Sequence, residues 1–428
     1  MVLLLCQRDQ AFEKQFISFL SRKREISRSV NKQVSSIIRS VRKEGDKALF
    51  DYSWVLDEVD LSVSGLKISC DEISSAVKSV SSETMDALSL SCERIEVYHR
   101  KQIPEDVSFT DSLGVELGWR WTAVDSVGLY IPGGTASYPS SVLMNGVPAK
   151  VAGVERIVMV VPCKKGIINP LVLAAADLVG IHEIYRIGGA QAIAALAYGT
   201  ETIKSVVKIV GPGNAYVASA KRQVFGKVGI DMIAGPSEIL VIADEANDPD
   251  WIASDLLSQA EHDSSAQAIL ITNSRHFANE VRKEVDRQLM ILPRVQTALA
   301  SWHDFGAIIL VDDLRDAVCL SNRIAPEHLE LAVKNPEFFL PKIRNAGAIF
   351  LGSYTPEAMG DYIGGSNHVL PTSGSASFSS PLSVLDYMKR TSLLKLHAEQ
   401  LKNLGPFAMR LAQEEGLEAH ARSIAIRL

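Results

Sequence analysis

Residues 183–197, EIYRIGGAQAIAALA, run from a short apolar segment through two glycines into an alanine-rich segment. Glu183–Ile187 has the length and the Ile and Tyr content of a strand, and Ala192–Ala197 is typical of a helix. Gly188 and Gly189 supply the turn between them. Because parallel strands need a long crossover, usually a helix, this unit predicts an α/β fold built on parallel sheets.

The same alternation continues on both sides of this unit, beginning at Gly118. Eight apolar runs within roughly 230 residues would fill two sheets better than one, each covered by helices on both faces. We therefore expect two incomplete, doubly wound, Rossmann-like domains. The predicted strands are Ser126–Ile131, Arg156–Val161, Glu183–Ile187, Val206–Val210, Ile239–Ala243, Ala268–Thr272, Ala307–Val311 and Gly347–Leu351.

The chain is too long for one typical core, so several domains are expected. A tail that follows the Ser/Gly-rich linker 372–380 must bury its apolar face on its own chain or on a second subunit. The expected parts are an N-terminal helical segment (1–22), a main α/β domain (23–124 with 238–374), an inserted α/β domain (125–237) and a C-terminal helical tail (375–428).

The composition excludes several classes of protein. The 428 residues contain 44 Lys and Arg against 50 Asp and Glu, with no basic cluster, so nucleic-acid binding has no electrostatic support. The five cysteines are scattered and form no C-x-x-C pair, which fits a reducing compartment. The sequence indicates no signal peptide and no apolar window of about 20 residues that could span a bilayer. We expect a cytoplasmic protein without nucleic-acid or membrane partners.

Three glycine-bearing turns follow predicted strands and carry polar side chains. Helix N-termini at such turns present free N–H groups to anions, and ligands of open α/β sheets bind where strands end. Together the turns predict a nucleotide site with Tyr130, Gln191 and Asn214 at its rim, although glycines also occur at such turns for backbone reasons alone. The sequence has no G-x-G-x-x-G pattern of a standard dinucleotide site. The turns are 128–140, 188–191 and 211–214.

Gln259 and His262 lie three residues apart in a stretch that is typical of a helix, so both can point at one atom. A borderline metal accepts imidazole nitrogen readily and carboxamide oxygen occasionally. Such a pair also arises by chance on solvated helices, so it needs further ligands. Asp361, in a glycine-rich loop with His368, is a reasonable third ligand, but this loop is also compatible with an ordinary turn.

Glu327 and His328 are adjacent after a proline and offer two bases of different proton affinity. Imidazole suits removal of a hydroxyl proton and a carboxylate can activate water, but both are also compatible with ordinary loop side chains. Glu415 and His420 flank a glycine in the tail, where a surface histidine is the simpler interpretation. Cys163 has no activating partner beyond two lysines, so a thiolate nucleophile is not expected.

Taken together, these segments resemble the histidinol dehydrogenase family over essentially the whole chain. No ligand or catalytic position departs from the family pattern. The resembling segments are GLYIPGGTASYPSSVLMNGVPA (128–149), GGAQAIAALAYGTE (188–201), KIVGPGNAYV (208–217), IDMIAGPSE (230–238), SQAEHD (258–263), PEHLEL (326–331), GDYIGGSNHVLPT (360–372) and EGLEAHARSIAIR (415–427).

The resemblance implies a homodimer with swapped tails and shared active sites, about one zinc per subunit, and NAD+. It implies that Glu327 and His328 act as the acid/base pair. The implied zinc ligands are Gln259, His262, Asp361 and His420, the last from the partner's tail. The implied NAD contacts are Tyr130, Gln191 and Asn214, and the implied substrate contacts are Ser237, Gln259, His262, His328, Asp361, Glu415 and His420.

The activity implied is a four-electron oxidation of L-histidinol to L-histidine through a bound aldehyde, at the end of histidine biosynthesis. Two alternatives stay open: a related zinc- and NAD-dependent dehydrogenase of another small alcohol, and a zinc hydrolase in which Glu327 activates water. The first is disfavoured by Ser237 and Glu415, which suit a substrate bearing amino and imidazole groups, and the second by the three nucleotide-type turns. A relative that binds metal or acts as a scaffold but has lost its catalytic activity is disfavoured, because Glu327 and His328 are both present.

Overall fold

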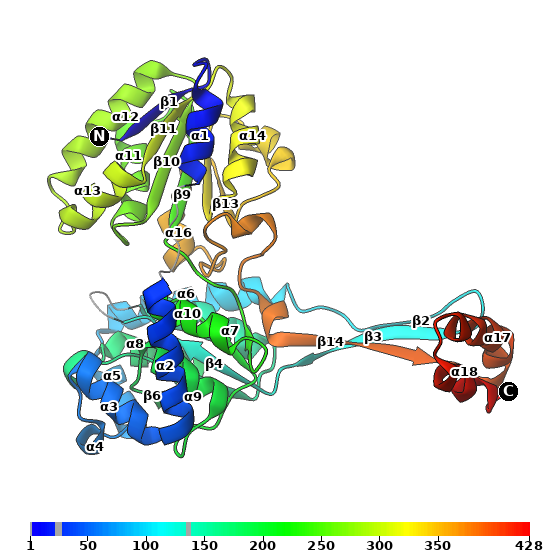
Figure 1. Cartoon of the computed structure of the whole chain (residues 1–428). Helices are drawn as coiled ribbons and strands as arrows, with labels where there is room; N and C mark the ends of the chain where they lie inside the picture. Colours follow the sequence, from blue (N-terminus) through cyan, green and yellow to red (C-terminus); the bar gives the residue numbers. More distant parts are fainter. Residues whose placement is uncertain (1, 22–27, 134–137) are drawn as a thin grey trace.

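The structure is a computed structural model that describes residues 2–21, 28–133 and 138–428. Figure 1 shows two α/β bodies, one above the other, and a long arm that leaves the lower body and ends in two helices. Part of the first glycine turn, 134–137, lies outside the described residues, as do residues 1 and 22–27. Among the described residues, no helix is long and apolar enough to cross a membrane.

The upper body is built on a six-stranded parallel sheet in the order β1-β11-β10-β9-β12-β13. Counted from β9 along the chain, the last five strands stand in the order 3-2-1-4-5, so the strand order reverses between β9 and β12. The strands are β1 (Leu3–Cys6), β9 (Glu238–Ala243), β10 (Gln267–Thr272), β11 (Ala307–Leu310), β12 (His328–Ala332) and β13 (Ala348–Leu351).

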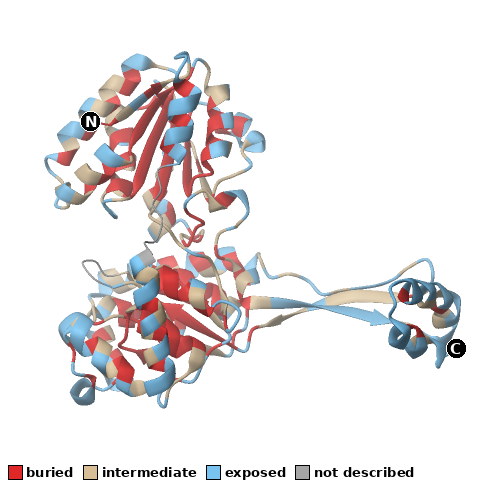
Figure 2. Cartoon of the chain, viewed as in Figure 1, coloured by how far each residue is buried: buried red, intermediate tan, exposed pale blue. Residues whose placement is uncertain are grey.

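Helices cover both faces of this sheet, and alternate residues of β9 face each layer. Ile239 and Val241 pack with one group of helices, while Leu240 and Ile242 pack with the other. The first layer contains α11 (Pro249–Ala260), α12 (Arg275–Leu289) and α13 (Val295–Asp304), and the second contains α1 (Phe12–Leu20), α14 (Leu314–Ile324) and α15 (Pro336–Phe339). Figure 2 shows the strands of this sheet buried between the layers.

The lower body contains a five-stranded parallel sheet in the order β6-β5-β4-β7-β8, which again runs 3-2-1-4-5 along the chain. One face is covered by the helices α7 and α8, and the other by α9 and α10. The elements are β4 (Ser126–Tyr130), α7 (Pro139–Val151), β5 (Arg156–Val160), α8 (Pro170–Val179), β6 (Glu183–Tyr185), α9 (Gly189–Tyr198), β7 (Lys208–Val210), α10 (Ala215–Val224) and β8 (Gly229–Ile230).

The helices that precede this sheet along the chain also pack on it, which corrects the expected domain grouping. Residues 23–124 were expected to join 238–374, but Val34 and Leu49 pack in one core with α9, and Ile73 and Ile95 in another with α7. Their apolar faces match the lower sheet and not the upper one. These helices are α2 (Arg28–Glu44), α3 (Asp46–Asp57), α4 (Leu61–Ser64), α5 (Cys70–Ser79) and α6 (Ser82–Arg100).

The arm is a three-stranded antiparallel sheet in the order β14-β3-β2, formed by β2 (Val107–Thr110), β3 (Glu116–Ala123) and β14 (Met388–Lys395). It carries α17 (Ala398–Glu414) and α18 (Glu418–Ala425) at its far end (Figure 1).

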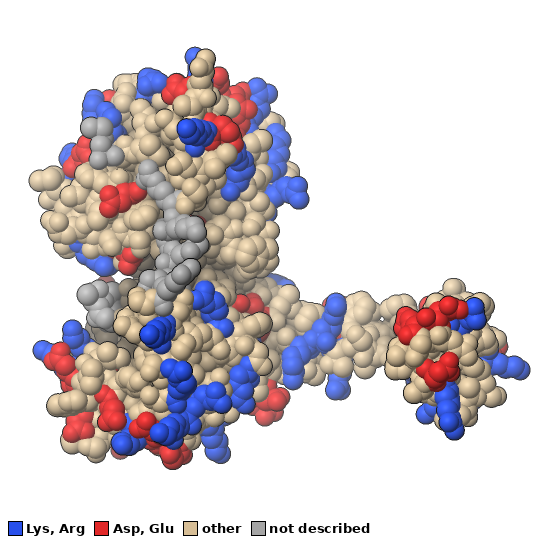
Figure 3. Space-filling view, viewed as in Figure 1, with Lys and Arg blue, Asp and Glu red and all other residues tan. Residues whose placement is uncertain are grey.

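In Figure 3, acidic and basic side chains are interspersed over the visible faces of both bodies, and basic ones lie on the arm.

All eight predicted strands are confirmed, with boundaries shifted by at most two residues. Two segments that were expected to be helical contain helices but also include a strand. Leu3–Cys6 is a strand that extends the parallel sheet of the upper body, and Met388–Lys395 is a strand of the arm. In both cases the partner strand comes from a distant part of the chain, so hydrogen bonding that the local pattern does not reveal decides the conformation.

Candidate active site

The predicted acid/base pair lies where the N-terminal ends of the upper sheet's strands meet the lower body. We call this side of the sheet its amino edge. His328 is the first residue of β12 and is paired with Ile239 of β9 on one side and Ala348 of β13 on the other. The short helix α16 (Glu357–Tyr362) lies between the bodies in Figure 1 and brings two carboxylates to the same place. Because β12 is paired on both sides, its position is fixed, and His328 lies on an interior strand next to the outermost strand β13.

His328 is held in a single orientation and tautomer. Its Nδ1 lies 2.8 Å from the backbone oxygen of Glu238, and since a carbonyl only accepts, Nδ1 must carry the proton. Nε2 is buried, has no hydrogen-bond partner among the described residues and lies 3.5 Å from a carboxylate oxygen of Glu357. Burial lowers the pKa of His328. The neutral ring thus presents an unprotonated Nε2, as a general base requires.

Glu327 is buried beside this histidine, with Oε2 at 3.7 Å from His328 Nδ1. Its Oε2 accepts a hydrogen bond of 2.8 Å from the backbone N–H of Glu238. Burial raises the pKa of Glu327 well above its usual value, and the neighbouring carboxylates add to this rise. Such a carboxyl can take and return a proton nearer to neutral pH than an exposed one.

Glu357 and Asp361 share one face of α16, because they lie four residues apart. With His328 they offer three ligand atoms that all lie within 4.8 Å of one another. Burial raises the pKa of Glu357 to about 8, with a further contribution from Asp361. Glu357 was not predicted from the sequence, although its spacing from Asp361 on a helical segment was the available signal.

The C-terminal end of α16 is held by the lower body, which fixes the position of Asp361. Ser91 Oγ donates to the backbone oxygen of Tyr362 at 2.5 Å, and Arg94 Nε donates to that of Ile363 at 2.5 Å. His368, which is half-buried, has Nδ1 at 3.6 Å from Asp361 Oδ1. The predicted grouping of Asp361 with His368 is thus present in the structure.

Gln259 and His262 lie beside this cluster at the end of α11. The helix ends at Ala260, so Gln259 is in its last turn and His262 is in the following turn, whereas a continuous helix was expected. Gln259 is 1 % exposed, and its Oε1 has no hydrogen-bond partner among the described residues. Burying an amide oxygen without a hydrogen-bond donor costs folding free energy. Coordination of a metal ion by this oxygen would offset that cost.

Ser237 immediately precedes β9 and is half-buried, and its backbone oxygen accepts from Gln267 N at 2.9 Å. This places Ser237 on the same amino edge as His328, since β9 and β12 are neighbours. Glu415 and His420 are not brought to this edge. Both are exposed, and they lie at the far end of the arm (Figure 1).

The three predicted NAD contacts lie at the carboxyl edge of the lower sheet. Tyr130 ends β4, and its hydroxyl accepts from Gly189 N at 3.1 Å, while burial raises the pKa of this phenol to about 12. Gln191, in the first turn of α9, is 1 % exposed and has a buried Oε1 without a hydrogen-bond partner among the described residues. Asn214 caps α10 by accepting from Tyr216 N and Val217 N.

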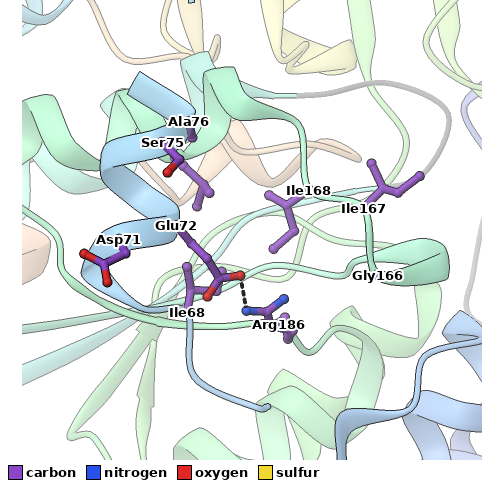
Figure 4. A pocket seen from close by; sticks show the side chains of 10 residues that line it. Ile68, Asp71, Glu72, Ser75, Ala76, Gly166, Ile167, Ile168 and Arg186 are labelled. Carbon is purple, nitrogen blue, oxygen red and sulfur yellow. Dashed lines mark hydrogen bonds and ion pairs between the residues drawn. The ribbon is translucent and has the colours of Figure 1, made fainter. Parts of the chain in front are cut away.

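A pocket of about 450 Å³ lies on the lower body between α5 and the segment 166–168, as Figure 4 shows. In it, Arg186 points toward Glu72, and the two side chains form an ion pair of 2.5 Å. None of the predicted site residues lines this pocket. Cys163 is buried nearby, and burial raises the pKa of its thiol to about 11, which agrees with the expectation that it is not a thiolate nucleophile.

The chain resembles known proteins over its whole length. The family model of histidinol dehydrogenase matches residues 20–428. Histidinol dehydrogenase of Brucella suis biovar 1 (strain 1330) is 64% identical over 428 residues, covering 100% of both chains. That of Rhizobium meliloti (strain 1021) is 65% identical over 420 residues, covering 98% of this chain and 97% of the relative.

A solved structure agrees with this assignment. The crystal structure of histidinol dehydrogenase from Elizabethkingia anophelis has a TM-score of 0.94 and 36% sequence identity, and the match covers 100% of this chain and 98% of that one. The chain therefore belongs to the histidinol dehydrogenase family.

Proposed function

We propose that this chain catalyses the NAD-dependent, four-electron oxidation of L-histidinol to L-histidine through bound L-histidinaldehyde, in the cytoplasm. The observation that carries this proposal is the setting of His328, whose Nδ1 is committed to a carbonyl and whose Nε2 is a buried, free base facing carboxylates. The choice of histidinol as the substrate, and the place of the reaction in histidine biosynthesis, are inferred from membership of the family.

Zinc would be held by Gln259, His262 and Asp361 of one chain and by His420 of the partner subunit. The unsatisfied oxygen of Gln259 and the closeness of Asp361 to His328 and Glu357 support a cation at this edge of the sheet. Nitrogen and oxygen donors of this kind suit zinc. When bound, the metal supplies a Lewis acid that anchors the imidazole and amino nitrogens of the substrate.

In the first oxidation, His328 takes the hydroxyl proton at Nε2 while the carbinol carbon gives a hydride to NAD+. The alcohol becomes an aldehyde, and the products of this step are NADH and a proton held by the protein. The lowered pKa of His328 keeps its ring neutral before the reaction. The hydrogen bond from Nδ1 to Glu238 O keeps Nε2 aimed at the substrate when the proton arrives.

In the second oxidation, Glu327 takes a proton from water as the oxygen adds to the aldehyde carbon. The hydrate then loses a second hydride to a second NAD+ and a proton to the protein, which gives the carboxylate of L-histidine. The raised pKa of Glu327 suits this exchange of protons near neutral pH. Tyr130, Gln191 and Asn214, at the strand ends of the lower sheet, would contact the dinucleotide.

The site would be completed by a second subunit in a homodimer. The two tail residues Glu415 and His420 lie at the end of an arm that carries them away from the catalytic edge of their own chain (Figure 1). The tail also exposes large apolar side chains, with Phe407 72%, Leu411 66% and Ile426 71% exposed. A terminal element of this kind is well suited to exchange between subunits.

The deciding experiment is the ratio of NADH formed to histidinol consumed, measured with and without a chelator. We expect two NADH per histidinol and loss of activity with the chelator. One NADH per histidinol with free aldehyde accumulating would contradict the four-electron reaction. Hydrolysis of an ester or amide without NADH would indicate the zinc hydrolase, and oxidation of another small alcohol in place of histidinol would indicate the related dehydrogenase.

A further inference from the structure

A buried ion pair lies beneath the glycine turns of the lower sheet, outside the set of predicted site residues. Lys221 of α10 pairs with Asp231, which follows β8, and the two side chains are 2% and 1% exposed. Lys221 Nζ donates to the backbone oxygen of Gly211 at 2.9 Å, and the backbone N–H of Gly211 donates to Asp231 Oδ2 at 2.8 Å. The pair thus bonds both backbone polar groups of one residue in the third glycine turn.

Gly211 cannot move freely in this setting. Its φ of +110° is readily adopted by glycine but strained for other residues. In addition, a Cβ atom at this position would lie 2.2 Å from the backbone oxygen of Tyr130. The hydroxyl of the same tyrosine accepts from Gly189 N in the second turn. The contacts therefore join all three glycine turns: Tyr130 ends β4, Gly189 begins α9, and Gly211 leads to Asn214 at the start of α10.

Core stability alone does not account for such a pair. Desolvating two charges is costly, and well-packed apolar residues often stabilise a core equally well. Apolar side chains at these positions would, however, leave the N–H and C=O of Gly211 buried without partners. The bonds to a single turn residue indicate that the pair serves the shape of that turn.

We propose that Lys221 and Asp231 are positioning residues for the dinucleotide. They hold Gly211–Asn214 in place, so that Asn214 and the N-terminus of α10 stay where the dinucleotide is proposed to bind. The pair itself lies beneath these residues and does not contact the dinucleotide. This inference rests on the proposed NAD dependence of the chain. According to this inference, the affinity of the enzyme for NAD+ and NADH depends on two buried side chains that do not contact either dinucleotide.

The test uses two charge-neutral double variants of the full-length enzyme. K221M/D231L removes both bonds to Gly211, whereas K221M/D231N keeps an acceptor for its N–H. We expect the NADH dissociation constant, measured by fluorescence, to rise about tenfold for K221M/D231L, which loses two hydrogen bonds of the turn, and about threefold for K221M/D231N, which loses one. The KM for histidinol and the zinc content should stay at wild-type values, while the KM for NAD+ rises with the dissociation constant.

Lys208→Met is the matched control. Lys208 lies on β7 of the same sheet and pairs with Asp386, away from the turns. This variant should lower the melting temperature and leave NADH affinity unchanged. Wild-type NADH affinity in a folded K221M/D231N or K221M/D231L, with only a lower melting temperature, would overturn the inference. Failure of the wild-type enzyme to bind or form NADH would instead contradict the proposed function.

Discussion

At the scale of single residues, the candidate site depends on buried polar atoms whose partners are fixed or missing. The carbonyl of Glu238 selects the tautomer of His328, and its N–H holds Glu327. The backbone of this one residue of β9 therefore orients both members of the proposed acid/base pair. Two glutamines each keep a buried oxygen without a hydrogen-bond partner among the described residues: Gln259, near the candidate active site, and Gln191, in the second glycine turn.

Substitutions of the acid/base pair should separate the two oxidations. We expect Glu327→Gln to slow the aldehyde-to-histidine step by about 10²–10⁴-fold, the usual contribution of a general base, and to affect the first step less. His328→Asn should slow the first step as well. Separate assays that start from histidinol and from histidinaldehyde measure each step. Equal losses in both steps for Glu327→Gln would remove its role in activating water.

The two buried glutamines provide reciprocal controls for metal and cofactor. Gln259→Leu should lower the affinity for zinc about tenfold, because a ligand oxygen is lost, and should leave NADH binding unchanged. Gln191→Leu should weaken NADH binding and leave zinc unchanged. Zinc content after dialysis and NADH fluorescence titration measure the two effects. Full zinc occupancy in Gln259→Leu at limiting zinc would exclude this side chain as a ligand.

At the scale of elements, the site is assembled by β12 and α16. Glu330 of β12 accepts a hydrogen bond of 2.6 Å from the backbone N–H of Glu357, which ties the start of α16 to the central strand. The other end of α16 is tied to α6 of the lower body through Ser91 and Arg94. Asp361 thus takes its position from two elements that are far apart in the sequence.

The contact between α6 and the loop after α16 predicts a pH-dependent stability. His99 is fully buried, with Nδ1 at 2.7 Å from Ile95 O and Nε2 at 3.2 Å from Asn367 Nδ2, and burial lowers its pKa below 6.5. When the pH falls below about 6.5, the unfolded chain takes up a proton at His99 before the folded one does. The unfolding free energy then falls by up to about 1.4 kcal/mol per pH unit from this residue until its folded-state pKa is reached.

His99→Gln should be less stable than wild type near pH 7 but should lose less stability on acidification to about pH 5.5. Urea unfolding at the two pH values measures the difference. His276→Gln, at an exposed position of α12, is the control and should keep the wild-type pH dependence. An unchanged pH dependence in His99→Gln would mean that His99 does not resist protonation in the folded protein.

At the scale of the whole molecule, the arm separates the tail from the candidate active site of its own chain (Figure 1). Mixing the inactive variants His420→Asn and His328→Asn should restore partial activity, because a mixed dimer would contain one site with both residues intact. Activity after unfolding and refolding of the mixture, compared with each variant alone, measures the rescue. A mixture that stays inactive, in solutions where light scattering shows dimers, would mean that the sites are not shared.

Much of the fold could be predicted from the sequence, and the misses have a common cause. The eight apolar runs became strands because fully buried parallel strands are apolar along their whole length. β12 was not recognised in this way, since His328 and Glu330 place polar side chains in a buried interior strand. Both side chains are buried at the candidate site, where His328 is the proposed base and Glu330 accepts a hydrogen bond from Glu357 N.

The sequence by itself determined the α/β class, eight of the strands, the glycine turns and, through family resemblance, most residues of the candidate site. The tertiary structure decided which helices cover which sheet and how His328 is oriented. It also decided that Glu357 lies beside Asp361 and that the tail helices are carried by an antiparallel β arm. The physical reason is the range of the interactions. Local patterns set hydrophobicity and turns, whereas strand pairing, buried hydrogen bonds and pKa shifts depend on groups that are brought together only when the chain folds.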